Sequence, residues 1–127
     1  MAHRILYYMV DGSTAKAQQI LKEWGVDEQI ELIECAHEPL VDPSPAQMLG
    51  CEGFIGEFGP VSAKTADAMA DAGIRIVSSM SIGINHVDAS ALAQHGIITT
   101  NCPGYCSLDV AQHAAGLMLD LMRSITF

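Results

Sequence analysis

The chain has 127 residues, of which 50% are hydrophobic, and its 15 acidic and 6 basic residues give a formal net charge of -9. This charge repels the phosphates of nucleic acids and anionic lipid headgroups, so we expect neither nucleic acid nor a membrane surface as a partner. The length and apolar content suit one domain with one sizeable core.

The first part of the sequence alternates strand-like and helix-like segments. Residues 4–10 (RILYYMV) are almost wholly apolar and contain aromatic and β-branched side chains, which predicts a strand that is buried on both faces and central in a sheet. A helix capped by Ser13 or Thr14 follows and ends before Gly25. Residues 30–36 (IELIECA) predict the second strand.

The next part contains an irregular connection and a third strand. Residues 37–47 hold three of the five prolines and predict a loop with one helical turn before Gly50. Residues 53–58 predict the third strand. A helix over residues 62–73, capped by Ser62 and closed by a glycine, comes next.

The same order recurs in the second half. Residues 75–80 predict a fourth strand, residues 88–96 a helix that begins at Asp88, and residues 97–101 a fifth strand. Strands and helices that alternate in this way pair their strands in parallel. The sequence therefore predicts a three-layer α/β domain with about five parallel strands.

Two glycines and a long final helix complete the pattern. Gly73 and Gly96 each close an alanine-rich helix and are followed directly by a strand, because glycine readily adopts the left-handed turn that this connection needs. Residues 107–125 keep apolar side chains at helical spacing over about five turns. We expect this helix to bury its apolar side against a partner surface.

The most informative segment for function follows the fourth strand. Residues 78–88 (SSMSIGINHVD) end a buried strand in a glycine-containing loop, and ligands of open α/β sheets bind at this end of the strands. Backbone N–H groups of Ser81, Ile82 and Gly83 can converge there on a small carboxylate, since Gly83 lets the chain turn sharply. The residues alone support an alternative about equally well, in which the loop has only a structural role. The glycine then serves a tight turn, and the polar side chains of Asn85, His86 and Asp88 satisfy local hydrogen bonds.

Two segments carry a resemblance to a known family. The first is SMSIGINHVD (79–88); a helix and Gly-Ile separate it from TTNCPGYCSLDVAQHAAGLMLDLMRSI (99–125). Over about residues 53–125 the chain resembles the N-terminal, substrate-binding domain of the D-isomer-specific 2-hydroxyacid dehydrogenases, whose pattern runs roughly G-x-D-H-V-D, G-I-x-V-x-N-x-P-G, A-V-A-E-H and G-L-M-L-A-L-x-R. The chain departs from it at three positions, where the family more often has aspartate, glutamate and a polar residue: Asn85, Gln112 and Cys106.

The resemblance implies a fold and a division into parts. Residues 1–106 would form a flavodoxin-like substrate-binding domain, and residues 107–127 a long interdomain helix that leads toward a Rossmann domain absent from this chain. The family reaction is the reversible reduction of a 2-keto acid by NADH. Its catalytic arginine, glutamate and histidine are expected downstream, so the chain alone should neither bind NAD tightly nor turn over substrate. The family also implies a homodimer with residues 107–125 near the interface.

The resemblance further implies which residues line the site for a small 2-keto or 2-hydroxy acid. The expected substrate-binding residues are Ser81, Ile82, Gly83 and Cys106. The residues expected to line the cleft near the nicotinamide are Pro103, Gly104, Tyr105 and Val110.

Several other interpretations are weaker. Cys102 and Cys106 with His113 suggest metal ligands, but a C-x3-C without a second pair is poor evidence, and we expect no metal. We expect neither His86 nor His113 to be the catalytic base. The hydroxyl-rich loop 11–16 resembles the FMN phosphate loop of flavodoxins, although a helix cap explains it more simply.

Two further alternatives concern the class of protein. A response-regulator receiver would need an aspartate where Glu57 stands, and a late lysine, and the sequence has neither. A freestanding carboxylate-binding or interaction module without catalysis remains open.

The sequence also bears on the compartment. No apolar stretch reaches the roughly 18 to 20 residues of a membrane-spanning helix, and the first residues turn polar too early for a signal peptide. A chain this apolar does not need disulfides to fold. We therefore expect a cytoplasmic protein with four reduced thiols, at Cys35, Cys51, Cys102 and Cys106.

Overall fold

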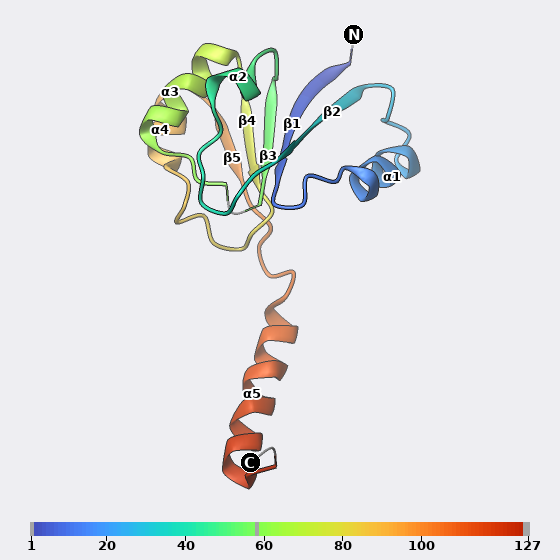
Figure 1. Ribbon diagram of the computed structural model, residues 1–127, viewed down its shortest axis with the longest axis vertical. Helices are drawn as coiled ribbons and strands as arrows, with labels where there is room; N and C mark the ends of the chain where they lie inside the picture. Colours follow the sequence, from blue (N-terminus) through green and yellow to red (C-terminus); the bar gives the residue numbers. More distant parts are fainter. Residues whose placement is uncertain (1, 58, 126–127) are drawn as a thin grey trace.

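A computed structural model describes residues 2–57 and 59–125, so the last residue of the predicted third strand lies outside the described residues. Five strands form one parallel sheet in the order β2-β1-β3-β4-β5, as Figure 1 shows. The strands are β1 (His3–Met9), β2 (Ile30–Ala36), β3 (Gly53–Gly56), β4 (Ile76–Ser79) and β5 (Ile98–Thr100). The helices are α1 (Ala15–Glu23), α2 (Pro45–Met48), α3 (Ala63–Ala72), α4 (Ala89–Gln94) and α5 (Ser107–Arg123). The predicted α/β fold with five parallel strands is confirmed.

Strand β1 lies inside the sheet, as its apolar sequence predicts. It pairs with β2 on one side and with β3 on the other. Its last four residues are all buried. Because successive side chains of a strand point to opposite faces, Leu6 and Tyr8 reach one layer of helices, while Ile5 reaches the other face.

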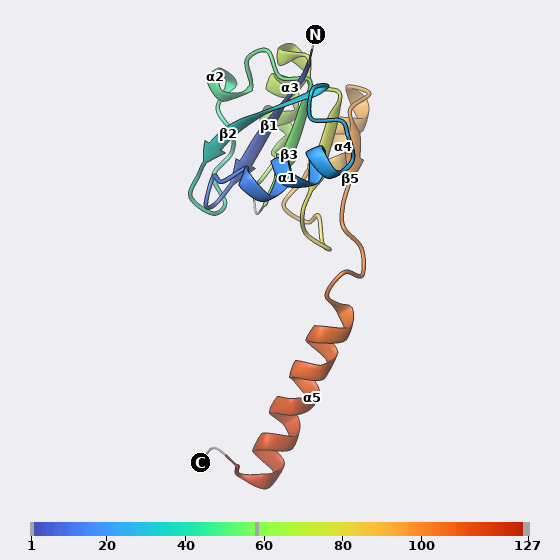
Figure 2. The same cartoon turned by 90° about the vertical axis from the view of Figure 1, so that its right-hand side faces the viewer.

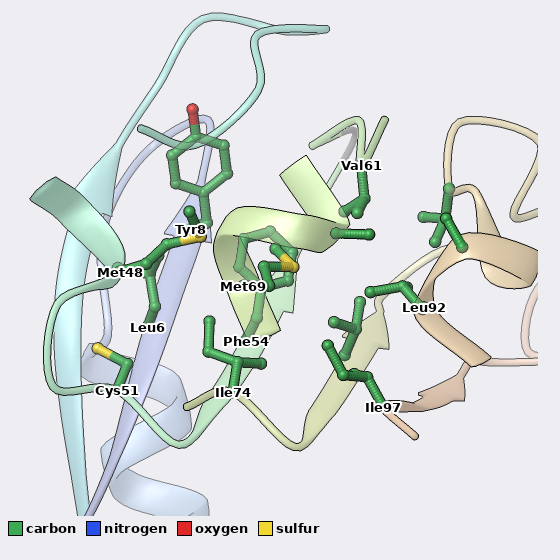
Figure 3. Packing of buried hydrophobic residues seen from close by; sticks show 14 residues of the cluster. Leu6, Tyr8, Met48, Cys51, Phe54, Val61, Met69, Ile74, Leu92 and Ile97 are labelled. Atoms are coloured by element: carbon green, nitrogen blue, oxygen red, sulfur yellow. The ribbon is translucent and has the colours of Figure 1, made fainter. Parts of the chain in front are cut away.

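The core lies between the sheet and helices α2, α3 and α4. Figure 3 shows Met48 of α2, Met69 of α3 and Leu92 of α4 packed in one apolar cluster with side chains from β1 and β3. These three side chains have no exposed surface. Burying a side chain of this size stabilises the fold by about 1.5 to 3 kcal/mol relative to leaving it in water.

The helix ends predicted for α3 and α4 are confirmed. The Ser62 hydroxyl accepts a hydrogen bond from the Thr65 N–H, and the Asp88 carboxylate accepts one from the Ala91 N–H, so each caps its helix. Gly73 and Gly96 have φ of 90° and 70°, the left-handed conformation that the sequence predicts at these positions.

The predicted cap of α1 is wrong in its chemistry. Thr14 occupies the N-cap position, but its side chain makes no capping hydrogen bond, because its backbone is already helical. Its backbone N–H and hydroxyl instead donate to the carboxylate of Glu34 at the end of β2. A carboxylate from a neighbouring strand therefore completes the N-terminus of α1.

The second face of the sheet is covered less completely. Among the helices of the described chain, only α1 lies over this face, and it buries none of its residues, while α5 extends away from the sheet (Figures 1 and 2). An open apolar groove of about 320 Å³ separates α1 from the sheet and is lined by Ile5, Ile55 and Ile76 on one side and by Ile20 and Leu21 on the other. Within residues 2–57 and 59–125, no helix is long and apolar enough to cross a membrane.

Candidate functional site

The candidate site lies at the carboxyl edge of the sheet, directly after β4. The Met80 N–H donates to the Gly56 carbonyl, so the chain leaves the sheet at residue 80. Loop 81–83 then stands clear of the core: Ser81 is half-buried, whereas Ile82 and Gly83 are exposed. This is the sheet edge at which open α/β folds bind their ligands.

Three consecutive carbonyls of this loop accept hydrogen bonds from within the protein. The Cys102 N–H donates to the Ser81 carbonyl at 3.1 Å, and the Asn101 side-chain amide donates to the Ile82 carbonyl at 2.7 Å. The Ser81 hydroxyl donates to the Gly83 carbonyl at 2.7 Å. Each carbonyl of loop 81–83 therefore has a fixed direction.

The direction of the carbonyls sets the direction of the amides. The described peptide bonds are all trans, and in a trans peptide the C=O and the N–H of the next residue point in opposite directions. The N–H groups of Ile82, Gly83 and Ile84 therefore point away from the groups that hold the carbonyls. None of the three has an acceptor among the residues that the structure describes.

The structure changes the expected role of Ser81. Its N–H lies 3.4 Å from the Ser79 hydroxyl oxygen, to which it donates, so it is not as free as its neighbours. The amides of this loop without an acceptor in the described chain are those of Ile82 and Gly83, the two residues expected to bind substrate, and that of Ile84, which sequence reasoning missed. Backbone N–H groups without a protein acceptor are donors that an anion can use.

The conformational reason proposed for Gly83 is wrong. Positive φ occurs at six glycines of the described chain, and Gly83 is not among them, so no sharp left-handed turn requires a glycine there. A Cβ added at Gly83 would meet no atom within 4 Å. The glycine therefore leaves open space above the loop instead of enabling its turn.

The loop after β5 lies against loop 81–83 because Asn101 and Cys102 both bond to it. The remaining predicted residues follow on this connection and at the start of α5, and Gly104 turns the chain with φ of 76°. Tyr105 and Val110 are each more than 60% exposed. All four residues expected near the nicotinamide are exposed on the described surface: Pro103, Gly104, Tyr105 and Val110.

Cys106 is less directly connected to the site. It is half-buried, stands at the N-cap of α5, and offers no side-chain hydrogen bond to that helix. No hydrogen bond joins Cys106 to loop 81–83 in the described part of the chain. No disulfide joins any of the four cysteines in the described chain.

Two carboxylates follow strands at the same sheet edge, Asp11 after β1 and Glu57 after β3. Burial raises the pKa of Tyr7, and the charges of Asp11 and Glu57 raise it further. These carboxylates disfavour an anion beside the ends of β1 and β3. Among the residues that the structure describes, no group of three histidine, cysteine, aspartate or glutamate side chains is placed to hold a metal ion.

The fold defines the class of protein: a three-layer α/β domain with an exposed loop at the carboxyl ends of its parallel strands, where open α/β folds bind ligands. The sequence profile of the D-isomer specific 2-hydroxyacid dehydrogenase catalytic domain matches residues 7–124, and the chain belongs to this family.

Individual relatives agree with this family. The chain is 36% identical over 76 residues to the peroxisomal glycerate dehydrogenase HPR of Arabidopsis thaliana, an alignment that covers 59% of this chain and 20% of that protein. A solved structure described as the pyruvate reductase of Chlamydomonas reinhardtii has a TM-score of 0.69 and 23% identity, covering 98% of this chain and 36% of that one. An NAD-complexed D-isomer specific 2-hydroxyacid dehydrogenase of Lactobacillus delbrueckii has a TM-score of 0.64 and 16% identity, with 96% and 36% covered. The chain thus spans about a fifth to a third of the length of these relatives.

Proposed function

We propose that this chain is the substrate-binding domain of an NAD-dependent D-2-hydroxyacid dehydrogenase that acts in the cytoplasm. In this proposal loop 81–83 receives the carboxylate of a small 2-keto or 2-hydroxy acid. The single observation that carries the proposal is the set of three amides, of Ile82, Gly83 and Ile84, that face away from their anchored carbonyls without an acceptor in the described chain.

The chemistry of the ligand matches these donors. A carboxylate accepts several hydrogen bonds at once, and bonds to an ionised acceptor are stronger than bonds between neutral groups. The neighbouring loop 101–106 would form the second wall of the cleft, with Cys106 on the substrate side. The whole enzyme would transfer a hydride to the keto carbon of the acid and a proton to its oxygen.

The residues of this chain do not fit a nucleotide site of their own. The sequence contains no G-x-G-x-x-G, and the carboxylates of Asp11 and Glu57 at the sheet edge repel a diphosphate. We infer that NAD(H) and the catalytic arginine, glutamate and histidine belong to a part of the enzyme outside these 127 residues. The chain alone is then expected to bind NAD weakly and to leave NADH unoxidised.

The proposal can be tested by titrating the 15N-labelled chain with pyruvate and following backbone amide resonances. We expect the amides of Ile82, Gly83 and Ile84 to shift most, because they would donate to the carboxylate. Pyruvamide, which is neutral, serves as the matched control and should shift them far less. Pyruvate shifts that are absent, or that centre elsewhere, would contradict the proposed site.

A homodimer with residues 107–125 near the interface forms the second part of the proposal. Helix α5 has 17 residues and buries none of them, and its exposed apolar side chains include Leu117, Met118, Leu121 and Met122. Sedimentation equilibrium should show a dimer that Leu121→Glu weakens. A wild-type protein that sediments as a monomer would contradict the homodimer, and the proposal that loop 81–83 binds substrate would not be affected.

A further inference from the structure

The Ser79 hydroxyl lies at the centre of a small polar network beneath loop 81–83. Ser79 ends β4 and is only 2% exposed. Its oxygen lies 2.6 Å from the Ser81 hydroxyl and 3.3 Å from Nε2 of His86. The network reaches the loop because the Ser81 hydroxyl contacts the Gly83 carbonyl at 2.7 Å.

Counting protons gives this network a direction. A hydroxyl has one proton, and a carbonyl can only accept, so the Ser81 proton must go to Gly83. In the 2.6 Å contact Ser81 is then the acceptor and Ser79 the donor. Ser79 has no proton left for His86, so Nε2 of His86 must donate to Ser79.

We propose that His86 and Ser79 are positioning residues for the substrate loop, acting through a directed chain of hydrogen bonds from His86 through Ser79 and Ser81 to the Gly83 carbonyl. This inference rests on the proposed function in one respect, that the loop binds a carboxylate. These hydrogen bonds fix the direction of the Gly83 carbonyl. Because the peptide is trans, the next amide, that of Ile84, then points to the opposite side.

The residue at the start of this series of hydrogen bonds, His86, has its backbone anchored. The Val61 N–H donates to the His86 carbonyl at 2.9 Å, and the Asp88 N–H donates to the Val61 carbonyl at 2.8 Å. These two bonds bracket His86 and tie its backbone to a segment outside the loop. The backbone from which the imidazole extends is therefore held in place, and each donated bond along this series of hydrogen bonds polarises the next one.

The proton count also explains why histidine suits this position. The neutral form with its proton on Nε2 can donate to Ser79 and leave Nδ1 as an acceptor. A side chain without a donor, such as phenylalanine, would leave the buried Ser79 oxygen with fewer partners. A glutamine side chain supplies an N–H donor and can replace the imidazole in part.

The first arm of the test uses no ligand. Long-range 15N–1H spectra of the labelled chain at a pH of about 8, where histidine is mostly neutral, should show the His86 proton on Nε2. A proton on Nδ1 would overturn the proposal. His86→Phe should also shift the amide resonances of Ser81, Gly83 and Ile84, while the remaining resonances show that the protein is still folded. Unchanged resonances of these loop amides would overturn the proposal as well.

The second arm measures pyruvate affinity by the same spectra. We expect His86→Phe to weaken binding by about tenfold, which is about 1.4 kcal/mol, and His86→Gln to recover most of the loss. Asn85→Ala, a change in an exposed loop residue, is the control and should leave affinity unchanged. Equal affinity in wild type and His86→Phe would overturn the positioning role. If the wild type binds no pyruvate, the proposed function fails, and the tautomer and loop amides of the first arm still decide the positioning role.

Discussion

The carboxylate of Glu34 accepts hydrogen bonds from both the backbone N–H and the hydroxyl of Thr14. These bonds lower the pKa of Glu34, the hydroxyl bond most strongly. The first turn of α1 therefore already holds a negative charge, at the place where the loop of a flavodoxin would hold the FMN phosphate. Thr14 is 1% exposed, so its hydroxyl is not available to a phosphate either. The contact between Thr14 and Glu34 therefore argues against an FMN phosphate site in loop 11–16.

A second acidic residue stabilises α3 from outside the helix. Asp42 accepts hydrogen bonds from the Ser62 N–H and hydroxyl and from the Thr65 hydroxyl. We expect Asp42→Ala to lower the free energy of unfolding by about 1 kcal/mol, the usual net contribution of an intramolecular hydrogen bond. Urea denaturation measures the change. Asp27→Ala, at an exposed position, is the control and should unfold as the wild type does.

The same residue predicts a dependence on pH. Burial raises the pKa of Asp42, but hydrogen bonds from Thr65 and Ser62 outweigh it and hold the pKa below its ordinary value of 3.8. A lowered folded-state pKa stabilises the fold above the unfolded value, and this contribution disappears as the pH falls through the folded value. The melting temperature of the wild type should thus fall below a pH of about 4. The gap between wild type and Asp42→Asn should close over the same range; a gap that widens on acidification would contradict the assignment.

The core can be tested with one substitution at two positions. Leu92 of α4 has no exposed surface, whereas Leu119 of α5 is 54% exposed. Leu92→Ala should cost about 2 to 5 kcal/mol, because it removes buried methyl groups and leaves a cavity. Leu119→Ala should change the stability of the domain by less than about 0.5 kcal/mol. Similar losses for both variants would mean that α5 is buried in solution.

A substitution at Gly83 can test carboxylate binding without disturbing the fold. A Cβ at this position meets no atom within 4 Å, so we expect Gly83→Val to fold normally. Its side chain would occupy the space above the loop and weaken pyruvate binding by more than about tenfold. Cys102→Ser should bind as the wild type does, since the contact of residue 102 with the loop is made by its backbone N–H. Equal losses in the two variants would count against the loop as the site.

Asn101 tests whether anchored carbonyls matter. Its side-chain amide donates to the Ile82 carbonyl at 2.7 Å. Asn101→Ala should free that peptide, weaken pyruvate binding by about 1 kcal/mol, and change the chemical shift of the Gly83 amide. Asn85→Ala removes the same kind of side chain from the same surface and should do neither. An unchanged Gly83 amide shift in Asn101→Ala would show that the Ile82 carbonyl is held by something else.

Local chemistry made much of the fold predictable. The apolar run of β1 and the glycines at positions 73 and 96 carry their structural reasons within a few residues, and the structure confirms all of them. The cap of α1 could not be predicted in this way. Glu34 lies twenty residues after Thr14 and reaches it only because β2 pairs beside β1. Partners that the sheet brings together are invisible to a local pattern.

The sequence predicted the candidate loop but not the contacts around it. The glycine-containing loop after β4 lies at the carboxyl edge of the sheet, and the amides of Ile82 and Gly83 have no acceptor within the described chain, while carboxylate binding there stays a prediction. The role of Asn101 was missed, although a signal existed: it directly follows β5, which neighbours β4, so their loops had to adjoin. The position of α5 could not be predicted either, because apolar spacing shows that a helix has a partner surface without showing where that surface lies.

The two bonds that join loop 81–83 to residues 101 and 102 also have a mechanical consequence. Both donors belong to the short connection that joins β5 to α5. A movement of α5 that shifts residues 101 and 102 would displace the carbonyls that orient the amides of loop 81–83. Linkage makes the effect reciprocal: any orientation of α5 that improves carboxylate binding is stabilised, by the same free energy, when the carboxylate binds.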